Sequence, residues 1–182
     1  LSTPFDVESN RLAVANSTSL MVFDLTKRTD SGYANILNKE STQPEEVYLS
    51  SSATSAYIVM LSDGNLSAMD VHGVDINLGL NQRSIAHVAV NQVELAIVYE
   101  DAPTTVHFAR IGAMGSIAIK EINATAPEEQ DAVLMEWGTP VDMPNATIVD
   151  VVFDEAFLAA TVNVSATDRL VVYNRSNDGQ WL

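Results

Sequence analysis

The sequence contains no cysteine, few basic residues and no long apolar run. Absence of cysteine excludes disulfides, thiolate zinc sites and a cysteine nucleophile. Nine Lys and Arg stand against 24 Asp and Glu, which gives a net charge of −15. Nucleic acid and anionic membrane surfaces require basic side chains, so neither is expected as a partner. The charge instead favours solubility, or diffuse binding of divalent cations. No apolar run reaches the ~18 residues that span a bilayer, so we expect no membrane insertion.

Motifs for catalysis and metal binding are also missing. There is no Gly-X-Ser-X-Gly, no His-Glu-X-X-His and no phosphate-binding glycine loop. His72, His87 and His107 lie on different predicted elements without ligand spacing, so we interpret them as ordinary strand or loop positions. Asp150 could face a central axis as half of a glycosidase pair, but a solvated surface role is favoured. We therefore predict no catalytic residue, no metal ligand, no bound cofactor and a non-enzymatic protein.

The sequence does contain a recurring hairpin. In residues 12–25 two apolar runs flank a short polar turn, which is typical of a β-hairpin. The same pattern returns at residues 56–71, 95–111 and 157–175. Successive second runs are offset by 46, 40 and 64 residues. A sheet unit that recurs every ~40–45 residues predicts the blades of a β-propeller.

The predicted fold is all-β, with four four-stranded antiparallel blades in one domain, 1–182, that is either a whole propeller or part of a larger one. The blades cover approximately residues 1–40, 45–80, 84–123 and 147–182. The third blade is expected to take its outer strand from residues 116–122, and the last blade looks like one whose outer strand is cut short. An insertion at 124–146 explains the long final offset. Within it, residues 127–130 indicate a helix start, and residues 132–137 fit either a short helix or an extra edge strand.

Alternation along the middle strands also predicts which side chains pack between blades. The expected core residues are Leu12, Val14, Val22, Ile58, Ala68, Ile97, Phe108, Leu158 and Val172.

Two segments, residues 10–24 and 148–181, resemble WD40-like and integrin-type (FG-GAP) β-propeller repeats. Asp24 and Asp70 are similar to the aspartate that closes the third strand of a WD repeat, although the Trp-Asp pair is absent. The calcium loop of integrin-type repeats, Asp-X-Asp-X-Asp-Gly, is absent as well, so calcium binding has no specific loop to support it. The resemblance implies a scaffold for protein contacts, adhesion or assembly.

Six Asn-X-Ser/Thr sequons occur where chance predicts about two. They are at Asn16, Asn65, Asn123, Asn145, Asn163 and Asn174. Most coincide with expected turns, where a bulky glycan can be accepted. The excess predicts N-linked glycans and a secreted or cell-surface protein. Every sequon except Asn174 falls at a connection expected on one side of the blades, so the other side and the blade rims are expected to carry protein contacts.

We thus expect a non-catalytic extracellular module that binds other proteins, copies of itself or a larger extracellular assembly. One alternative is a propeller-type carbohydrate-active enzyme or lectin, in which Trp137 and Trp181 could stack on sugar, although core or rim packing is favoured for both. A second alternative is an intracellular WD-like scaffold whose sequons are accidental.

Overall fold

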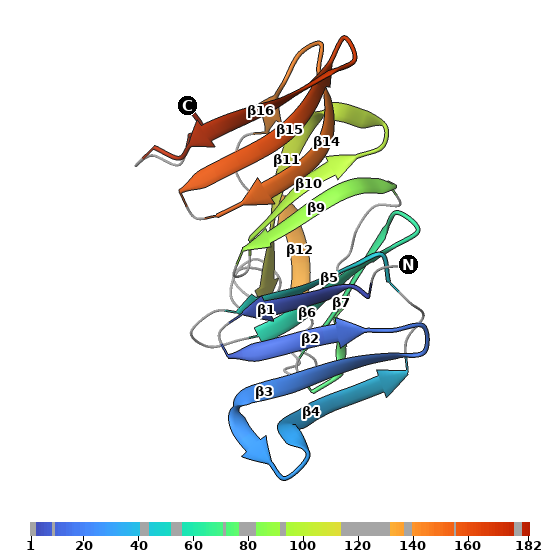
Figure 1. Ribbon diagram of the computed structural model, residues 1–182. Helices are drawn as coiled ribbons and strands as arrows, with labels where there is room; N and C mark the ends of the chain where they lie inside the picture. Colours follow the sequence, from blue (N-terminus) through green and yellow to red (C-terminus); the bar gives the residue numbers. More distant parts are fainter. Residues whose placement is uncertain are drawn as a thin grey trace, which may run out of the picture.

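A computed structural model describes the chain in eleven ranges: residues 3–8, 10–40, 44–51, 56–70, 72–76, 83–91, 94–113, 132–136, 140–154, 156–176 and 180–182. Every regular element in these ranges is a β-strand, and the strands form four antiparallel sheets that follow one another along the chain (Figure 1). The prediction of an all-β fold made of successive blade-like sheets is confirmed. The predicted helix start at 127–130 lies outside the described residues.

The first two sheets each contain four strands in sequence order, as predicted. The first consists of β1 (Phe5–Glu8), β2 (Arg11–Ala15), β3 (Ser19–Thr29) and β4 (Gly32–Glu40). The second consists of β5 (Glu46–Ser51), β6 (Ala56–Ser62), β7 (Asn65–Asp70) and β8 (Asp75–Ile76). Each strand pairs with the next through a short connection, which is the meander order of a propeller blade.

The third sheet differs from its prediction at the outer strand. Its first three strands are β9 (Ile85–Asn91), β10 (Glu94–Tyr99) and β11 (Ala102–Ala113). The long strand β11 then pairs with β12 (Ala132–Glu136) along one part and with β13 (Val141–Asp142) along another. Part of the predicted insertion 124–146 therefore belongs to this sheet, because its extended apolar residues complete the unpaired edge of β11. The outer strand predicted at 116–122 lies outside the described residues.

The fourth sheet has three full strands and the start of a fourth. They are β14 (Thr147–Phe153), β15 (Phe157–Val164) and β16 (Thr167–Asn174). Beyond β16, Arg175 forms an antiparallel bridge with Trp181, and the backbone groups of Asn174 and Leu182 exchange hydrogen bonds of 2.9 and 3.0 Å. This arrangement matches the expectation of a shortened outer strand.

Two of the hairpins turn through a pair of successive left-handed residues. In the β6–β7 turn, Asp63 and Gly64 have φ of +48° and +72°. A two-residue type I′ turn requires positive φ at both positions, and Asp-Gly is a favoured pair for it. In the β15–β16 turn the same conformation is held by Ser165 and Ala166, with φ of +52° and +63°. Both of these residues carry a Cβ atom, so this second turn is the less favourable one.

Apolar side chains fill the space between each pair of successive sheets. The innermost strands β1, β5, β9 and β14 contact one another in that order. In β6, Ile58 and Met60 pack against the first sheet, whereas Val59 and Leu61 pack toward the third. In β10, Leu95 packs toward the second sheet and Ala96 toward the fourth. Sheets two and three are therefore buried on both faces, as propeller blades are.

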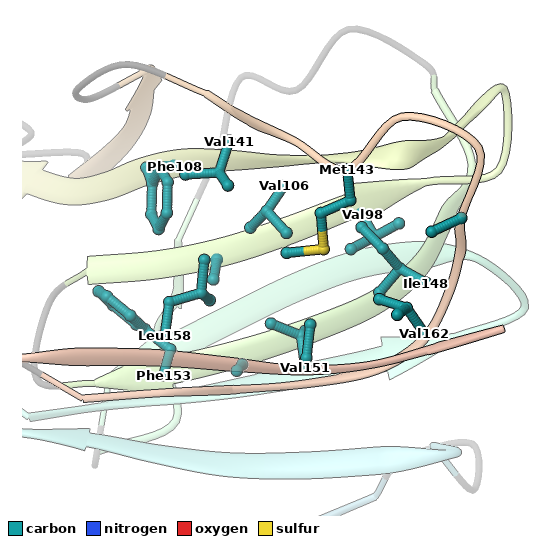
Figure 2. Close-up of a cluster of buried hydrophobic side chains, with 14 residues drawn as sticks. Val98, Val106, Phe108, Val141, Met143, Ile148, Val151, Phe153, Leu158 and Val162 are labelled. Atoms are coloured by element: carbon teal, nitrogen blue, oxygen red, sulfur yellow. The ribbon is translucent and has the colours of Figure 1, made fainter. Parts of the chain in front are cut away.

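The largest of these clusters lies between the third and fourth sheets. Figure 2 shows Val98, Val106 and Phe108 of the third sheet pointing toward Val151, Phe153 and Leu158 of the fourth. The ring centroids of Phe108 and Trp181 lie 5.2 Å apart in a stacked arrangement, and both rings contact Phe153. The prediction that Trp181 has a packing role agrees with this contact, whereas Trp137 lies outside the described residues.

Polar contacts join the sheets at the same places. Asp6 of β1 accepts a 2.7 Å hydrogen bond from the backbone N–H of Leu49 in β5. Arg175 and Glu94 form a 2.9 Å ion pair between the fourth and third sheets, with side chains 23% and 17% exposed. Because both side chains are largely removed from water, losing either partner would leave a poorly solvated, unpaired charge between the two sheets.

Candidate glycosylation sites and interaction surfaces

The structure describes five of the six sequon asparagines, and each lies at or beside the end of a strand. Asn16, Asn65 and Asn163 lie at the connections between the second and third strands of the first, second and fourth sheets. Asn145 precedes β14, and Asn174 ends β16. Asn123 lies outside the described residues. In an antiparallel sheet of this order, the connections between the second and third strands and the entry to the first strand all lie at the same end of the strands. We call this end of each sheet the sequon edge, and the other end of the strands the opposite edge.

Asn16 is half-buried and shapes its own turn. Its Oδ1 atom accepts hydrogen bonds from the backbone N–H groups of Thr18 and Ser19, both at 2.9 Å. The hydroxyls of the same two residues approach Oδ1 at 3.1 and 3.2 Å. This is the local side-chain-to-backbone bonding for which asparagine is favoured in turns. A glycan attaches at Nδ2, so the turn bonds at Oδ1 and a sugar are compatible.

Asn65 and Asn163 donate local hydrogen bonds from their Nδ2 atoms. Exposed Asn65 donates to the Asp63 carbonyl at 3.0 Å. Asn163 donates to the Asp168 carboxylate at 2.7 Å and accepts from the Ala166 backbone N–H at 3.2 Å. The Asn163 bonds support the strained β15–β16 turn, so its side chain has a structural role besides its sequon.

Asn145 and Asn174 are exposed. Asn145 has a left-handed backbone with φ of +66°, a conformation that asparagine tolerates better than most residues. Asn174 pairs with Phe157 and lies at the opposite edge of the fourth sheet. Its place there agrees with the sequence-based assignment, which set it apart from the other sequons.

The three histidines and Asp150 lie on different elements of the fold. His72 is exposed in a turn, while His87 and His107 are half-buried on β9 and β11. The His107 ring packs edge-on against Tyr99 at 5.0 Å. Asp150 is exposed on β14, the first strand of its sheet. Among the described residues, no group of three His, Cys, Asp or Glu is placed to hold a metal ion, and no helix could span a membrane.

One partly buried polar contact was missed by sequence reasoning. The Tyr48 hydroxyl on β5 lies 2.6 Å from the Val88 carbonyl on β9 and 2.7 Å from a Glu46 carboxylate oxygen. Burial raises the pKa of Tyr48 well above its ordinary value, and the neighbouring Glu46 charge adds to the shift. The hydroxyl therefore stays protonated and links the second sheet to the third. Alternation reveals that Tyr48 is on a strand, but not which partner its hydroxyl meets.

A further feature that sequence reasoning missed is a pair of sheet faces that carry apolar side chains and that no other sheet among the described residues covers. The register places one set on the side of the first sheet that turns away from the second: Phe5, Val7, Leu12, Val14, Met21 and Phe23. We call this the first outward face. A second set lies on the side of the fourth sheet that turns away from the third: Val152, Phe157, Ala159, Thr161, Leu170 and Val172. We call this the second outward face. The two sheets lie at opposite ends of the molecule (Figure 1).

The outward faces explain where the core prediction was wrong. Val22, Ile58, Ala68, Ile97, Phe108 and Leu158 are buried as predicted. Leu12 and Val14 are only half-buried, and Val172 is 52% exposed. All three exceptions lie on an outward face. Their alternation is that of a packed strand, but no neighbouring sheet in the described residues covers them.

Together the four sheets and their packing define the β-propeller class of fold. No protein-family model and no curated protein matches the chain. Similar solved structures are BamB from Moraxella catarrhalis (TM-score 0.52, 14% identity), Hsv2 from Kluyveromyces marxianus (0.52, 11%) and the N-terminal domain of Nup159 (0.50, 14%). The matches cover 92, 98 and 97% of this chain but only 41, 60 and 45% of those chains. The chain therefore spans about half the length of these propellers.

Proposed function

We propose that this chain is a non-catalytic β-propeller module that binds other proteins, and that it works outside the cell as an N-glycosylated protein. The observation that carries the proposal is the distribution of the sequons. Asn16, Asn65, Asn145 and Asn163 all lie at the sequon edge of their sheets, while the opposite edge has Asn174 alone among the described sequons. A dry protein interface cannot readily enclose a branched sugar.

Protein binding is supported by the class of fold. Nup159, one of the similar propellers, is seen in a structure of S. cerevisiae Dbp5 bound to Nup159, Gle1, IP6 and ADP. A rigid ring of sheets offers loop edges and rims for such contacts without any chemistry of its own. For this chain we infer contacts at the opposite edge and the rims. The resemblance to WD40-like and integrin-type repeats points the same way, toward assembly or adhesion.

Glycosylation is tested by expressing the chain in a secretory eukaryotic host. The intact mass of the secreted protein should decrease on enzymatic removal of N-glycans, by an amount that corresponds to several glycans. Glycopeptide analysis should find Asn65 and Asn145 occupied, because both are exposed at the sequon edge. Ser67→Ala and Thr147→Ala should each remove one glycan. A secreted chain with no modified sequon would contradict the extracellular proposal and favour the intracellular alternative.

The binding edge is tested by adding a sugar where none is expected. Thr29→Asn creates a sequon, Asn-Asp-Ser, beside the β3–β4 turn at the opposite edge. Crosslinking in the source tissue should capture protein partners with the wild-type chain. The added glycan should reduce capture several-fold, whereas Ser67→Ala, which removes a glycan from the sequon edge, should not. Equal loss with both variants would contradict the assignment of edges.

The carbohydrate-active alternative makes a different prediction. It requires carboxylates or aromatic rings that converge on a sugar, whereas Trp181 is packed against Phe108 and Phe153. Saturating binding on a glycan array, lost on Asp150→Asn, would favour it over a protein-binding module.

A further inference from the structure

Both outward faces expose large apolar side chains, and the register also places Asp150, Asn163, Asp168 and Asn174 on the second. Phe5 and Val7 are 66% and 53% exposed, and Val152 and Leu170 are 63% and 71% exposed. Across the sheets the apolar residues stand in register: Phe5 opposite Val14, which is opposite Met21. Contiguous exposed apolar area of this kind marks a binding surface rather than ordinary surface.

The position of the two faces in the repeat indicates what covers them. One face of the first sheet packs on the second, one of the second on the third, and one of the third on the fourth. Each of the first three sheets has one face that the next sheet covers, and the second outward face is the corresponding face of the fourth sheet. Each of the last three sheets has one face that the previous sheet covers, and the first outward face is the corresponding face of the first sheet. Both therefore fit the apolar face of another blade, by the same packing that joins the four sheets.

The source of those blades follows from two further observations. In each of the three similar propellers, the part that matches these four sheets is 41–60% of a single chain, so the remainder of that chain is joined to it covalently. A second copy of this chain would bring another net charge of −15, and like charges oppose such an association. Covalent continuation avoids the entropy cost of association.

We propose that each outward face is a blade-packing surface covered by a further antiparallel sheet of the same polypeptide, so that these four sheets form an arc of a larger closed propeller. The sequons agree with this arrangement. Asn163 and Asn174 lie at the two ends of the second outward face, not at its centre. Sugars there can project past the edges of a covering blade.

The first test is the size of the native polypeptide. The protein is captured from its source with an antibody against this segment, treated to remove N-glycans and measured by mass spectrometry. The proposal expects one chain heavier than 19.7 kDa by at least one blade of roughly 5 kDa, at ~40–45 residues a blade. A native chain of 19.7 kDa would overturn it. Light scattering would then distinguish two cases: a dimer would show that a second copy covers the faces, and a monomer would show that nothing covers them.

The second test asks whether the faces are buried in that native-length protein. Val7→Gln and Val172→Gln place a polar amide on the first and second outward faces. If blades cover them, each should lower Tm by about 5 °C or more, since both lose apolar burial and bury an amide. The matched control is Val74→Gln, on a 62% exposed valine outside both faces, and it should shift Tm by about 1 °C or less. Shifts no larger than the control's would overturn the proposal even for a heavier chain. Neither test depends on glycosylation or on a partner.

Discussion

At the scale of single residues, the side chains with the clearest roles are those that hold a turn. Asn16 holds the β2–β3 turn through two 2.9 Å bonds to backbone N–H groups. Asn16→Gln should lower the free energy of unfolding by roughly 1–2 kcal/mol, because each lost bond contributes about 0.5–1.5 kcal/mol. Thr18→Ala also removes the sequon but keeps both bonds, so it should cost under about 0.5 kcal/mol. Urea denaturation of unglycosylated protein measures the difference, and equal losses would contradict the role of Oδ1.

Asp24 is a carboxyl whose pKa is lowered by its hydrogen bonds. Its carboxylate accepts hydrogen bonds from the Thr26 hydroxyl at 2.6 Å and from the Thr26 backbone N–H at 2.9 Å. These bonds, with a contribution from Lys27, lower its pKa from the ordinary 3.8 to about 2. A carboxyl with a depressed pKa stabilises the fold fully above its ordinary value. That contribution is lost as the pH falls from about 4 to about 2.

The prediction for Asp24 follows from the order of these causes. Thr26→Ala removes the largest one and should move the pKa of Asp24 back toward 3.8, while Thr26→Ser keeps a hydroxyl and should leave it near 2. Titration of the Asp24 carboxyl carbon by NMR between pH 1.5 and 6 measures both. An unchanged pKa in Thr26→Ala would show that the hydroxyl is not the main cause.

At the scale of elements, the β15–β16 hairpin contains a turn whose backbone conformation is unfavourable for the residues that form it. Ala166 has φ of +63° and carries a Cβ atom, a conformation that costs about 1–2 kcal/mol for an L-residue. Ala166→Gly should raise the free energy of unfolding by roughly 0.5–1 kcal/mol after the extra chain entropy of glycine is subtracted. Gly64→Ala, in the equivalent β6–β7 turn, is the reverse control and should lower it. The sequon at Asn163 is intact in the first variant. Thermal unfolding that moves the same way for both would contradict this reading.

The elements also show what sequence could predict. The continuous apolar run Ile58, Val59, Met60 and Leu61 indicates a strand that is apolar on both sides, and the structure places it between two sheets. The Asp63-Gly64 turn was equally readable, because its residues satisfy a local rule. The outer strand at 132–136 was ambiguous, because a short apolar run suits a helix or a strand until its partner β11 is known. Leu12, Val14 and Val172 were misjudged because alternation reports which side a residue faces but not whether anything covers that side.

Packing between elements can be tested in the aromatic cluster of the third and fourth sheets. Phe108 is 7% exposed and contacts both Trp181 and Phe153. Phe108→Ala should lower the free energy of unfolding by about 3–5 kcal/mol, since it leaves a cavity. Phe157→Ala removes the same ring from a 51% exposed site and should cost under about 1 kcal/mol in the 182-residue chain. A loss under about 1 kcal/mol for Phe108 would count against this packing.

At the scale of the whole molecule, the four sheets fall into an inner pair that is buried on both faces and an outer pair that is buried on one face. The second and third sheets are packed on both sides, and in β10 all of Leu95 to Tyr99 are buried. Within the described part of the chain, the first and fourth sheets are packed on one side only. Local opening costs least where few apolar contacts are lost, so stability should fall from the middle of the arc to its ends.

Hydrogen exchange of the 182-residue chain should show this gradient directly. Amides paired between β6 and β7 and between β9 and β10 should exchange slowest, and those of β4 and β16 fastest, because the latter are outer strands of sheets with an uncovered face. If exchange depended only on the position of a strand within its sheet, the pattern would be different. The fourth strands β4 and β8 would then exchange at similar rates, and so would the second strands β2 and β6. In the native-length protein, further blades would bury the outward faces, and protection of β2 and β15 should rise to that of β6 and β10. Equal protection of β2 and β6 in the 182-residue chain would show that one-sided packing does not set local stability here.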